Sequence, residues 1–220
     1  MKRFLRDNGL SIVSFLLFAI FLVASSFTGL AEHNQELRDH GAPPIGYADF
    51  IVSGEFIEVV AENWESEFLQ MALYVLLTAF LFQRGSSESK DPDGKEEVDR
   101  DPRKSKDPNA PWPVKRGGLV LKLYENSLSI AFFLLFLFSF LLHARGGQLD
   151  YNEDQLAHGG ETITVAQYMG TSRFWYESFQ NWQSEFLAVW AIVVFSIWLR
   201  QRSSPESKPV DAPHSETGSS

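Results

Sequence analysis

The sequence predicts an all-α membrane protein in which four transmembrane helices form two tandem-duplicated helical hairpins. Residues 10–31 contain no charged side chain, and residues 126–144 contain none apart from a His that can take up a proton. An uncharged apolar stretch of about 18 or more residues is long enough to cross the hydrocarbon core of a bilayer. The second observation is an internal repeat, because the segment 7–84 recurs without gaps at 125–202.

The repeat has a constant offset of 118 positions, and 25 of its 78 aligned pairs are identical. Apolar composition alone produces chance matches in the oily stretches, but it does not explain matches between polar residues. The phrase NWxSEFL stands at 63–69 and again at 181–187, and the dipeptide His-Gly stands at 40–41 and 158–159. We therefore predict a tandem duplication in which each copy is one two-helix unit.

Each copy begins with one apolar span and ends with another. The first spans cover about 10–30 and 127–144, and the second spans cover about 64–83 and 182–200. The first spans are nearly free of polar residues, whereas an amphipathic helix of a soluble protein carries a polar face. The second spans are shorter in their strictly apolar part, so their length is judged from the residues at their ends.

Four residues are expected to mark where the second spans meet water. Twenty steps separate Trp64 from Arg84, which corresponds to about 30 Å of helix and so to the thickness of a bilayer core. Trp182 and Arg202 hold the same places in the second copy. Trp and basic residues are typical of membrane boundaries. We therefore predict that both Trp residues anchor one boundary and both Arg residues the other.

The Lys and Arg residues predict the orientation. Of 19 such residues, 16 lie in the first six positions, in 84–122, or from residue 200 onward. Loops rich in Lys and Arg stay in the cytoplasm, so the N- and C-termini are predicted on the cytoplasmic side of the membrane. A cleaved signal peptide over the first span is the alternative, but the equivalent span of the second copy is internal.

Two polar segments are predicted to lack a core of their own. Residues 85–118 are rich in charge, Pro, Gly and Ser, and residues 203–220 are similar. Such composition buries too little apolar surface to offset the loss of chain entropy on folding. The first segment is therefore predicted to be a flexible cytoplasmic linker and the second a disordered tail. Acidic residues interleave with the basic ones in the linker, which argues against nucleic acid as a partner.

The segments leading into the second spans are predicted to be amphipathic. Apolar and acidic residues alternate at helical spacing in 47–64, and aromatic and polar residues do so in 171–182. Each segment is expected to be either a short helix at the outer membrane surface or the start of one continuous helix through NWxSEFL. Ser53 and Ser172 are the predicted N-caps. With 19 Phe residues, the spans are expected to pack through bulky side chains rather than through Gly contacts.

The candidate polar site consists of Glu67 and Glu185, with Asn63 and Asn181 four residues before them. Residues four apart share one helix face, and two Glu residues meeting at a pseudo-two-fold axis would suit a cation or a proton. The structural alternative is simpler. An acid in the first turn of a span is favoured by the helix dipole, and Asn favours helix caps.

Several chemistries lack their motifs. The chain has no Cys, which excludes disulfides and thiolate chemistry. His33, His40, His143 and His158 fall in predicted outer segments, but without the spacing of a metal site. The phosphate-binding, dinucleotide-binding and nucleophile-elbow motifs are also missing. No metal, cofactor or catalytic residue is therefore predicted.

The quoted residues resemble those of an uncharacterised bacterial family of duplicated four-helix membrane proteins. The resemblance rests on NWxSEFL, on the NGLSI and NSLSI starts and on the QRGSSESKDP exit, and it covers about 7–90 and 125–208. It implies a fold and no activity. The predicted function is that of a non-enzymatic multi-pass membrane protein, structural or partner-binding in the envelope, with the lipid bilayer and a protein partner or second copy as partners. The alternatives are a small cation or proton carrier that uses Glu67 and Glu185, and, more weakly, an enzyme acting on lipid head groups.

Overall fold

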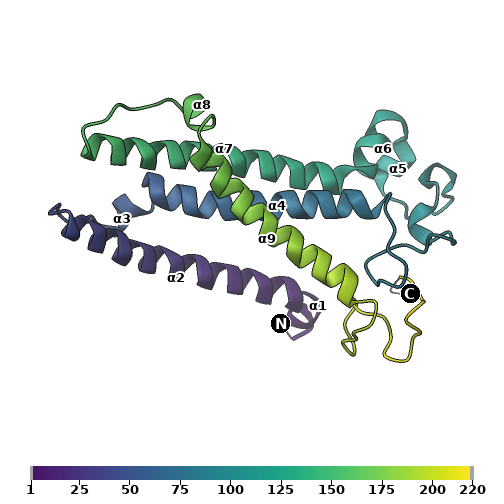
Figure 1. Cartoon of the computed structure of the whole chain (residues 1–220). Coiled ribbons are helices and arrows are strands. Elements are labelled where there is room, and N and C mark those ends of the chain that lie inside the picture. Colours follow the sequence, from purple (N-terminus) through teal and green to yellow (C-terminus); the bar gives the residue numbers. More distant parts are fainter. Residues whose placement is uncertain (1, 219–220) are drawn as a thin grey trace. The chain divides into compact units, whose positions relative to one another are not determined.

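The computed structural model describes residues 2–218, in which helices are joined by loops and turns (Figure 1). It has nine α-helices, two short 3-10 helices and no strand among the described residues, which confirms the all-α prediction. Four helices are long: α2 (Gly9–Asp39), α4 (Gly54–Thr78), α7 (Ser127–Ala157) and α9 (Ser172–Phe195). The short ones are α1 (Lys2–Asp7), α3 (Tyr47–Phe50), the 3-10 helices Glu97–Asp99 and Pro102–Lys104, α5 (Trp112–Arg116), α6 (Gly118–Glu125) and α8 (Val165–Tyr168).

The chain divides into two compact units, each of which combines residues from both halves of the sequence. The first unit contains Met1–Val60 and Leu142–Gly170. The second contains Ala61–Leu141 and Thr171–Ser220. The units are described separately below.

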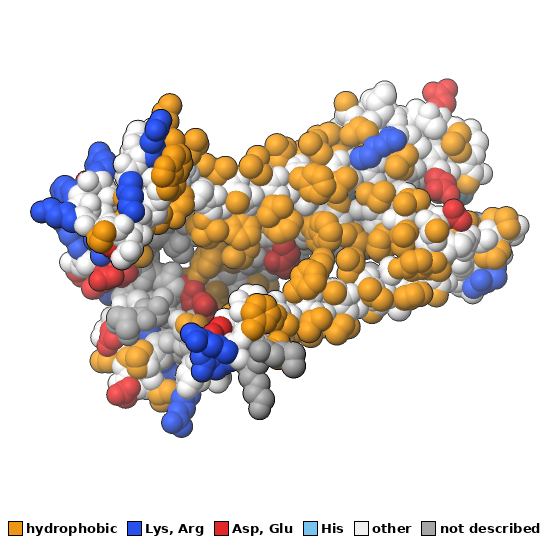
Figure 2. All heavy atoms as spheres, turned by 180° about the vertical axis from the view of Figure 1, so that it is seen from behind, with side chains coloured by type: hydrophobic (Ala, Val, Ile, Leu, Met, Phe, Trp, Pro, Cys, Tyr) orange, Lys and Arg blue, Asp and Glu red, His pale blue; other side chains and the backbone are white. Residues whose placement is uncertain are grey.

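Helices α2 and α7 are long and apolar enough to span a membrane. Each has 31 residues, and only 6% of the most apolar window of α2 and 17% of that of α7 is buried within the protein. The core helix of a soluble protein would be mostly buried, whereas these two helices expose Phe, Leu, Ile and Val side chains along their length (Figure 2).

The structure contains two such helices rather than the four expected from the sequence. Helix α4 fails because it ends at Thr78, and the 18 residues before this end include Glu62, Glu65 and Glu67. Helix α9 fails because amide, hydroxyl and charged side chains occupy its first half. Both helices therefore stop short of the predicted ends of the spans at about 83 and 200.

Helices α4 and α9 end several residues before the predicted Arg anchors. The Thr78 hydroxyl donates to the Tyr74 carbonyl oxygen over 3.0 Å. At the end of α9, the Arg200 guanidinium donates to the carbonyl oxygen of Ser196 over 3.0 Å and to that of Ile197 over 3.2 Å. These two carbonyl groups lie just after α9, whose own last carbonyl groups accept backbone N–H groups, such as that of Ser196 on Ile192 and that of Ile197 on Val194.

Helices α4 and α9 each run without interruption through NWxSEFL. Of the two predicted alternatives, the structure therefore contains the continuous helix. Ser53 caps α4 as predicted, since its hydroxyl oxygen accepts the Phe56 backbone N–H over 3.2 Å. The predicted cap Ser172 is wrong by one position. Thr171 is the N-cap of α9, and its hydroxyl oxygen accepts the Phe174 N–H over 3.3 Å.

In the first unit, the loops that follow α2 and α7 are held by the same pair of hydrogen bonds. The Asn34 amide donates to the Ile45 carbonyl oxygen over 3.1 Å, and the Ile45 N–H donates to the Asn34 amide oxygen over 2.7 Å. Asn152 and Ile163 exchange the same two bonds over 3.0 and 2.8 Å. These residues stand 118 positions after the first pair, and so do the bounds of α7 and α8 relative to α2 and α3.

Close packing in the first unit depends on Gly residues. A Cβ atom added at Gly146 would lie 2.5 Å from the Glu58 backbone nitrogen, and one at Gly29 would lie 2.9 Å from the Phe50 ring. Helix α7 therefore approaches the start of α4 at backbone distance. This corrects the expectation that bulky side chains alone would make the helix contacts, since a side chain at Gly146 would separate the two backbones.

In the second unit, the tail packs against the beginning of the predicted linker. Lys208 is 1% exposed, and its ammonium group donates to the carbonyl oxygens of Gly85, Pro213, His214 and Glu216 over 2.5 to 3.3 Å. The Gly218 N–H donates to the Ser86 carbonyl oxygen over 2.9 Å. These contacts are hydrogen bonds to backbone carbonyl oxygens, which composition alone does not reveal.

Candidate functional site

The predicted polar residues of NWxSEFL all lie in the second unit. Glu67 is exposed and Glu185 is half-buried. The Gln70 amide donates to the Glu185 backbone carbonyl oxygen over 3.4 Å, and the side-chain charges of Glu67 and Glu185 are close enough to interact. The structure therefore brings the two acids into one neighbourhood.

The Asn and Ser residues of the phrase bond to nearby backbone. The Ser66 hydroxyl donates to the Asn63 carbonyl oxygen over 2.8 Å, and the Ser184 hydroxyl donates to that of Asn181 over 2.8 Å. The Asn181 amide donates to the Glu177 carbonyl oxygen, one turn earlier, over 3.1 Å. These bonds stabilise the helix itself and fit the structural explanation of the phrase.

Of the two predicted Trp anchors, Trp182 has a packing role that the sequence did not indicate. Its indole N–H donates to Glu65 Oε1 over 2.9 Å, and Glu65 is fully buried. The Trp182 ring also contacts Phe136 and Phe179, with centroid distances of 6.3 and 5.5 Å. Glu65 was not predicted as a site residue because its equivalent in the second copy is Gln183, whereas Glu67 is repeated as Glu185.

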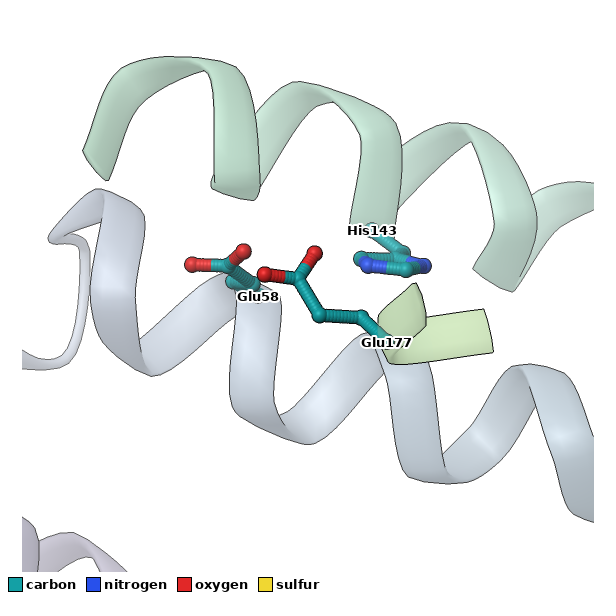
Figure 3. A group of neighbouring side chains, drawn as sticks. All are labelled: Glu58, His143 and Glu177. Carbon is teal, nitrogen blue, oxygen red and sulfur yellow. The ribbon is translucent and has the colours of Figure 1, made fainter. Parts of the chain in front are cut away.

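Three side chains of the first unit that carry titratable groups are buried, namely Glu58, His143 and Tyr168, with exposed fractions of 5%, 0% and 0%. Figure 3 shows the Glu58 side chain on α4 and the His143 ring on α7, both directed into the space between these helices. A Glu58 carboxylate oxygen and a His143 ring nitrogen lie within 4.8 Å of each other. The Tyr168 hydroxyl donates to Glu58 Oε1 over 2.9 Å. Glu177, also drawn, belongs to the second unit, where Arg173 pairs with it over 2.8 Å.

Gly147 makes room for this buried cluster. A Cβ atom at Gly147 would lie 2.6 Å from Glu58 Oε1 and would overlap the Tyr168 hydroxyl. Any larger residue would therefore push the carboxylate and the phenol apart. Because the cluster combines an acid, an imidazole and a phenol in a water-poor environment, it is the part of the first unit best suited to bind a proton or a cation.

Glu58, His143 and Tyr168 were not predicted as a site from the sequence. They stand apart in the chain, and none of them is repeated in the other copy, where the equivalent positions hold Tyr176, Ser25 and Phe50. A signal was present, because His143 is the one titratable residue in an otherwise uncharged span, and such a residue inside a span commonly has a function.

A second acid–imidazole pair lies in the same unit. His33 Nδ1 and Glu55 Oε2 are 2.5 Å apart. Burial raises the pKa of Glu55, the neighbouring Asp150 and Glu36 act in the same direction, and the His33 contact counteracts this rise only in part. A carboxyl group with a raised pKa keeps its proton in the folded protein at pH values where the unfolded chain has lost it.

This raised pKa predicts a pH dependence of stability. The stability from the Glu55 proton is complete below the ordinary value of 4.5 and is lost as the pH rises through the folded pKa. Thermal midpoints of the wild type should therefore fall over this window, and those of Glu55→Gln should fall less. Parallel curves for the two proteins, measured by circular dichroism from about pH 4 to pH 8, would contradict the prediction.

Together, the fold and these sites define an all-α protein with two candidate membrane-spanning helices and a buried polar cluster. Residues 1–219 match the model of a domain of unknown function, DUF6766, and the chain belongs to this family. No curated protein and no solved structure matches the chain.

Proposed function

We propose that the chain is a non-enzymatic integral protein of a bacterial inner membrane, held there by α2 and α7, with a structural or partner-binding role. The observation that carries this proposal is the exposed apolar surface of these two helices. Leu10, Phe15 and Phe21 of α2 are 84%, 66% and 66% exposed. Such surface is favourable in lipid and unfavourable in water.

Extraction of membranes tests this anchoring. The wild type should stay in the membrane pellet after an alkaline carbonate wash and should be released by detergent. An acidic residue at the centre of a span costs about 3 kcal/mol, so Phe15→Asp combined with Leu134→Asp should reduce the pelleted fraction. Val98→Asp is the control, because Val98 is also exposed, at 77% against 66% for Phe15 and 62% for Leu134, but lies outside both helices. Release of the wild type by carbonate would rule out the proposal.

The distribution of Lys and Arg supports an orientation in which both termini and residues 84–122 face the cytoplasm. Although only α2 and α7 are long and apolar enough to span on their own, this orientation requires the chain to return through α4 and α9, and the two copies of a tandem duplication then point the same way. The matched bounds of α2 and α7, and the matched Asn–Ile hydrogen bonds, support this duplication.

Single Cys residues test the orientation, because the chain has no Cys of its own. In intact spheroplasts, a membrane-impermeant maleimide should label His40→Cys, and it should label Ser105→Cys only after permeabilisation. If both positions are labelled from outside, α4 does not cross. If only Ser105→Cys is labelled, the orientation is reversed.

A second candidate function is cation or proton transport that uses Glu67 and Glu185. The observation in its favour is that these acids lie in one unit with interacting charges. Proteoliposomes should then show cation or proton flux that falls in Glu67→Gln/Glu185→Gln and persists in Glu161→Gln, an exposed acid of the other unit. Flux at the protein-free level in the wild type would remove this candidate and leave the anchoring role untouched.

A further inference from the structure

Helix α6 turns apolar side chains outward directly before the span α7, which begins after a single intervening residue. Leu121 is buried, at 4%, whereas Leu119 and Leu123 are 80% and 63% exposed. Residues four apart lie on the same face of a helix, so Leu119 and Leu123 form one apolar strip. Trp112 of the preceding α5 is also exposed, at 64%. Leu121 therefore packs α6 against the second unit while the strip faces away from it.

Basic side chains accompany this strip. The segment 112–124 contains three basic residues and no acid; the three are Lys115, Arg116 and Lys122. Arg116 and Lys122 are exposed, and the Lys115 ammonium group donates to the Pro108 carbonyl oxygen over 2.6 Å. Figure 2 shows hydrophobic side chains beside those of Lys and Arg over this part of the chain. The segment thus combines uncovered apolar surface with a purely positive charge.

Asn126 separates α6 from the span. Its side-chain amide donates to the Lys122 carbonyl oxygen over 2.9 Å and closes α6. Its own carbonyl oxygen accepts the Ile130 N–H over 3.0 Å and opens α7. The uncharged stretch of α7 is long enough to cross a bilayer, so a separate helix that ends at its first residue lies at the membrane boundary.

The first copy repeats this construction. Helix α1 also precedes its span after a single residue, Asn8, whose amide donates to the Phe4 carbonyl oxygen over 3.0 Å. Phe4 and Leu5 are 63% and 50% exposed. Arg3 and Arg6 are exposed as well, although both pair with the acid that ends α1. A short helix with outward apolar and basic side chains therefore stands before each of the two spans.

From these observations we propose that α6 lies in the plane of the membrane surface and binds anionic phospholipids. Leu119 and Leu123 enter the boundary of the acyl chains, and Arg116 and Lys122 contact the phosphate groups. Helices with an apolar face and Lys or Arg beside it bind bilayers in this way. The inference rests on the anchoring and orientation proposed above, which place α6 on the cytoplasmic side, where anionic lipids attract basic segments next to a span.

A fluorescent label on α6 tests the docking. The chain has no Cys, so Leu119→Cys carries a single polarity-sensitive nitrobenzoxadiazole group. The full chain is reconstituted in nanodiscs of phosphatidylcholine, with or without an equal amount of phosphatidylglycerol, and spin-labelled lipid serves as the quencher. With phosphatidylglycerol, the label should emit at shorter wavelength and be quenched. Labels at Leu134, within α7, and at Val98, which is 77% exposed outside both spans, give the reference values for lipid and water.

Removal of charge tests the choice of lipid. Each basic residue near an anionic surface favours binding by about 5-fold, so Arg116→Gln/Lys122→Gln should lower the ratio of docked to undocked α6 by about 25-fold. High salt should weaken docking in the same direction, because it screens exposed charges. Both side chains are exposed, and circular dichroism verifies the fold. Lys95→Gln is the control, because Lys95 is an exposed base outside α5 and α6, and it should dock as the wild type does.

Three results would each overturn the proposal. The Leu119 label could be as exposed to water as the Val98 label, it could be quenched equally with and without phosphatidylglycerol, or it could shift in emission without quenching by lipid. The last result would place protein rather than lipid over α6. If the label at Leu119 disturbs the fold, Leu123→Cys reports from the same strip. A chain that resists carbonate but leaves Leu119 in water keeps its anchor and lacks the docking, whereas a chain released by carbonate lacks both.

Discussion

Lys208→Ala is expected to lower the free energy of unfolding by about 3 kcal/mol. The ammonium group of Lys208 is buried and lies within hydrogen-bonding distance of four backbone carbonyl oxygens. Its removal leaves these acceptors in a space that its own side chain had filled. Lys208→Met keeps most of the side-chain volume without the charge, so similar losses in both variants would attribute the effect to the hydrogen bonds.

Lys90→Ala is the matched control for Lys208→Ala. Lys90 is the counterpart of Lys208 in the first copy, 118 positions earlier, and it forms an ion pair with Asp99 over 2.6 Å at the surface. A surface ion pair is worth about 0–1 kcal/mol, so the loss should be small. Equal destabilisation by the two substitutions, in thermal or denaturant unfolding, would show that the buried Lys208 contacts stabilise the protein no more than a surface ion pair does.

Gly147→Ala is expected to destabilise the first unit by about 1–3 kcal/mol. The added methyl group would overlap the Tyr168 hydroxyl and lie 2.6 Å from Glu58 Oε1. Relief of this clash requires the phenol or the carboxylate to move, which weakens their hydrogen bond. Gly9→Ala provides the comparison, because a Cβ atom there meets nothing within 4 Å. Ala also favours helix over Gly by about 1 kcal/mol.

Midpoints of thermal unfolding measured in the same detergent check this contrast. Gly9→Ala should melt at or above the wild-type temperature and Gly147→Ala clearly below it. Equal midpoints for the two variants would mean that the close approach at Gly147 is readily relaxed.

The sequence predicted the features that depend on periodicity and composition. The absence of charge in 10–31 and 126–144 identified the two helices that the structure makes longest and most apolar. The offset of 118 positions, used consistently, would also have located the cap of α9, since Ser53 maps to Thr171 and not to Ser172.

The sequence did not predict the ends of the second helices or the buried polar contacts. The apolar residues after Thr78 favoured a longer span, but α4 ends at Thr78 and α9 at Phe195. The group of Glu58, His143 and Tyr168 depends on contacts between residues 85 or more positions apart, where no local pattern operates. Glu67 was predicted as a site residue because it is repeated as Glu185 in the second copy. The members of the buried cluster are not repeated, so the repeat gave no indication of them.

The paired bonds of Asn34 with Ile45 and of Asn152 with Ile163 have a consequence for hydrogen exchange. Each Asn side chain holds the amide of its Ile within a loop that has no regular ladder of backbone hydrogen bonds. An amide exchanges with solvent deuterium only when its hydrogen bond opens. Ile45 and Ile163 should therefore be slowly exchanging amides among fast neighbours, and loss of either Asn should bring its Ile to the rate of the surrounding loop.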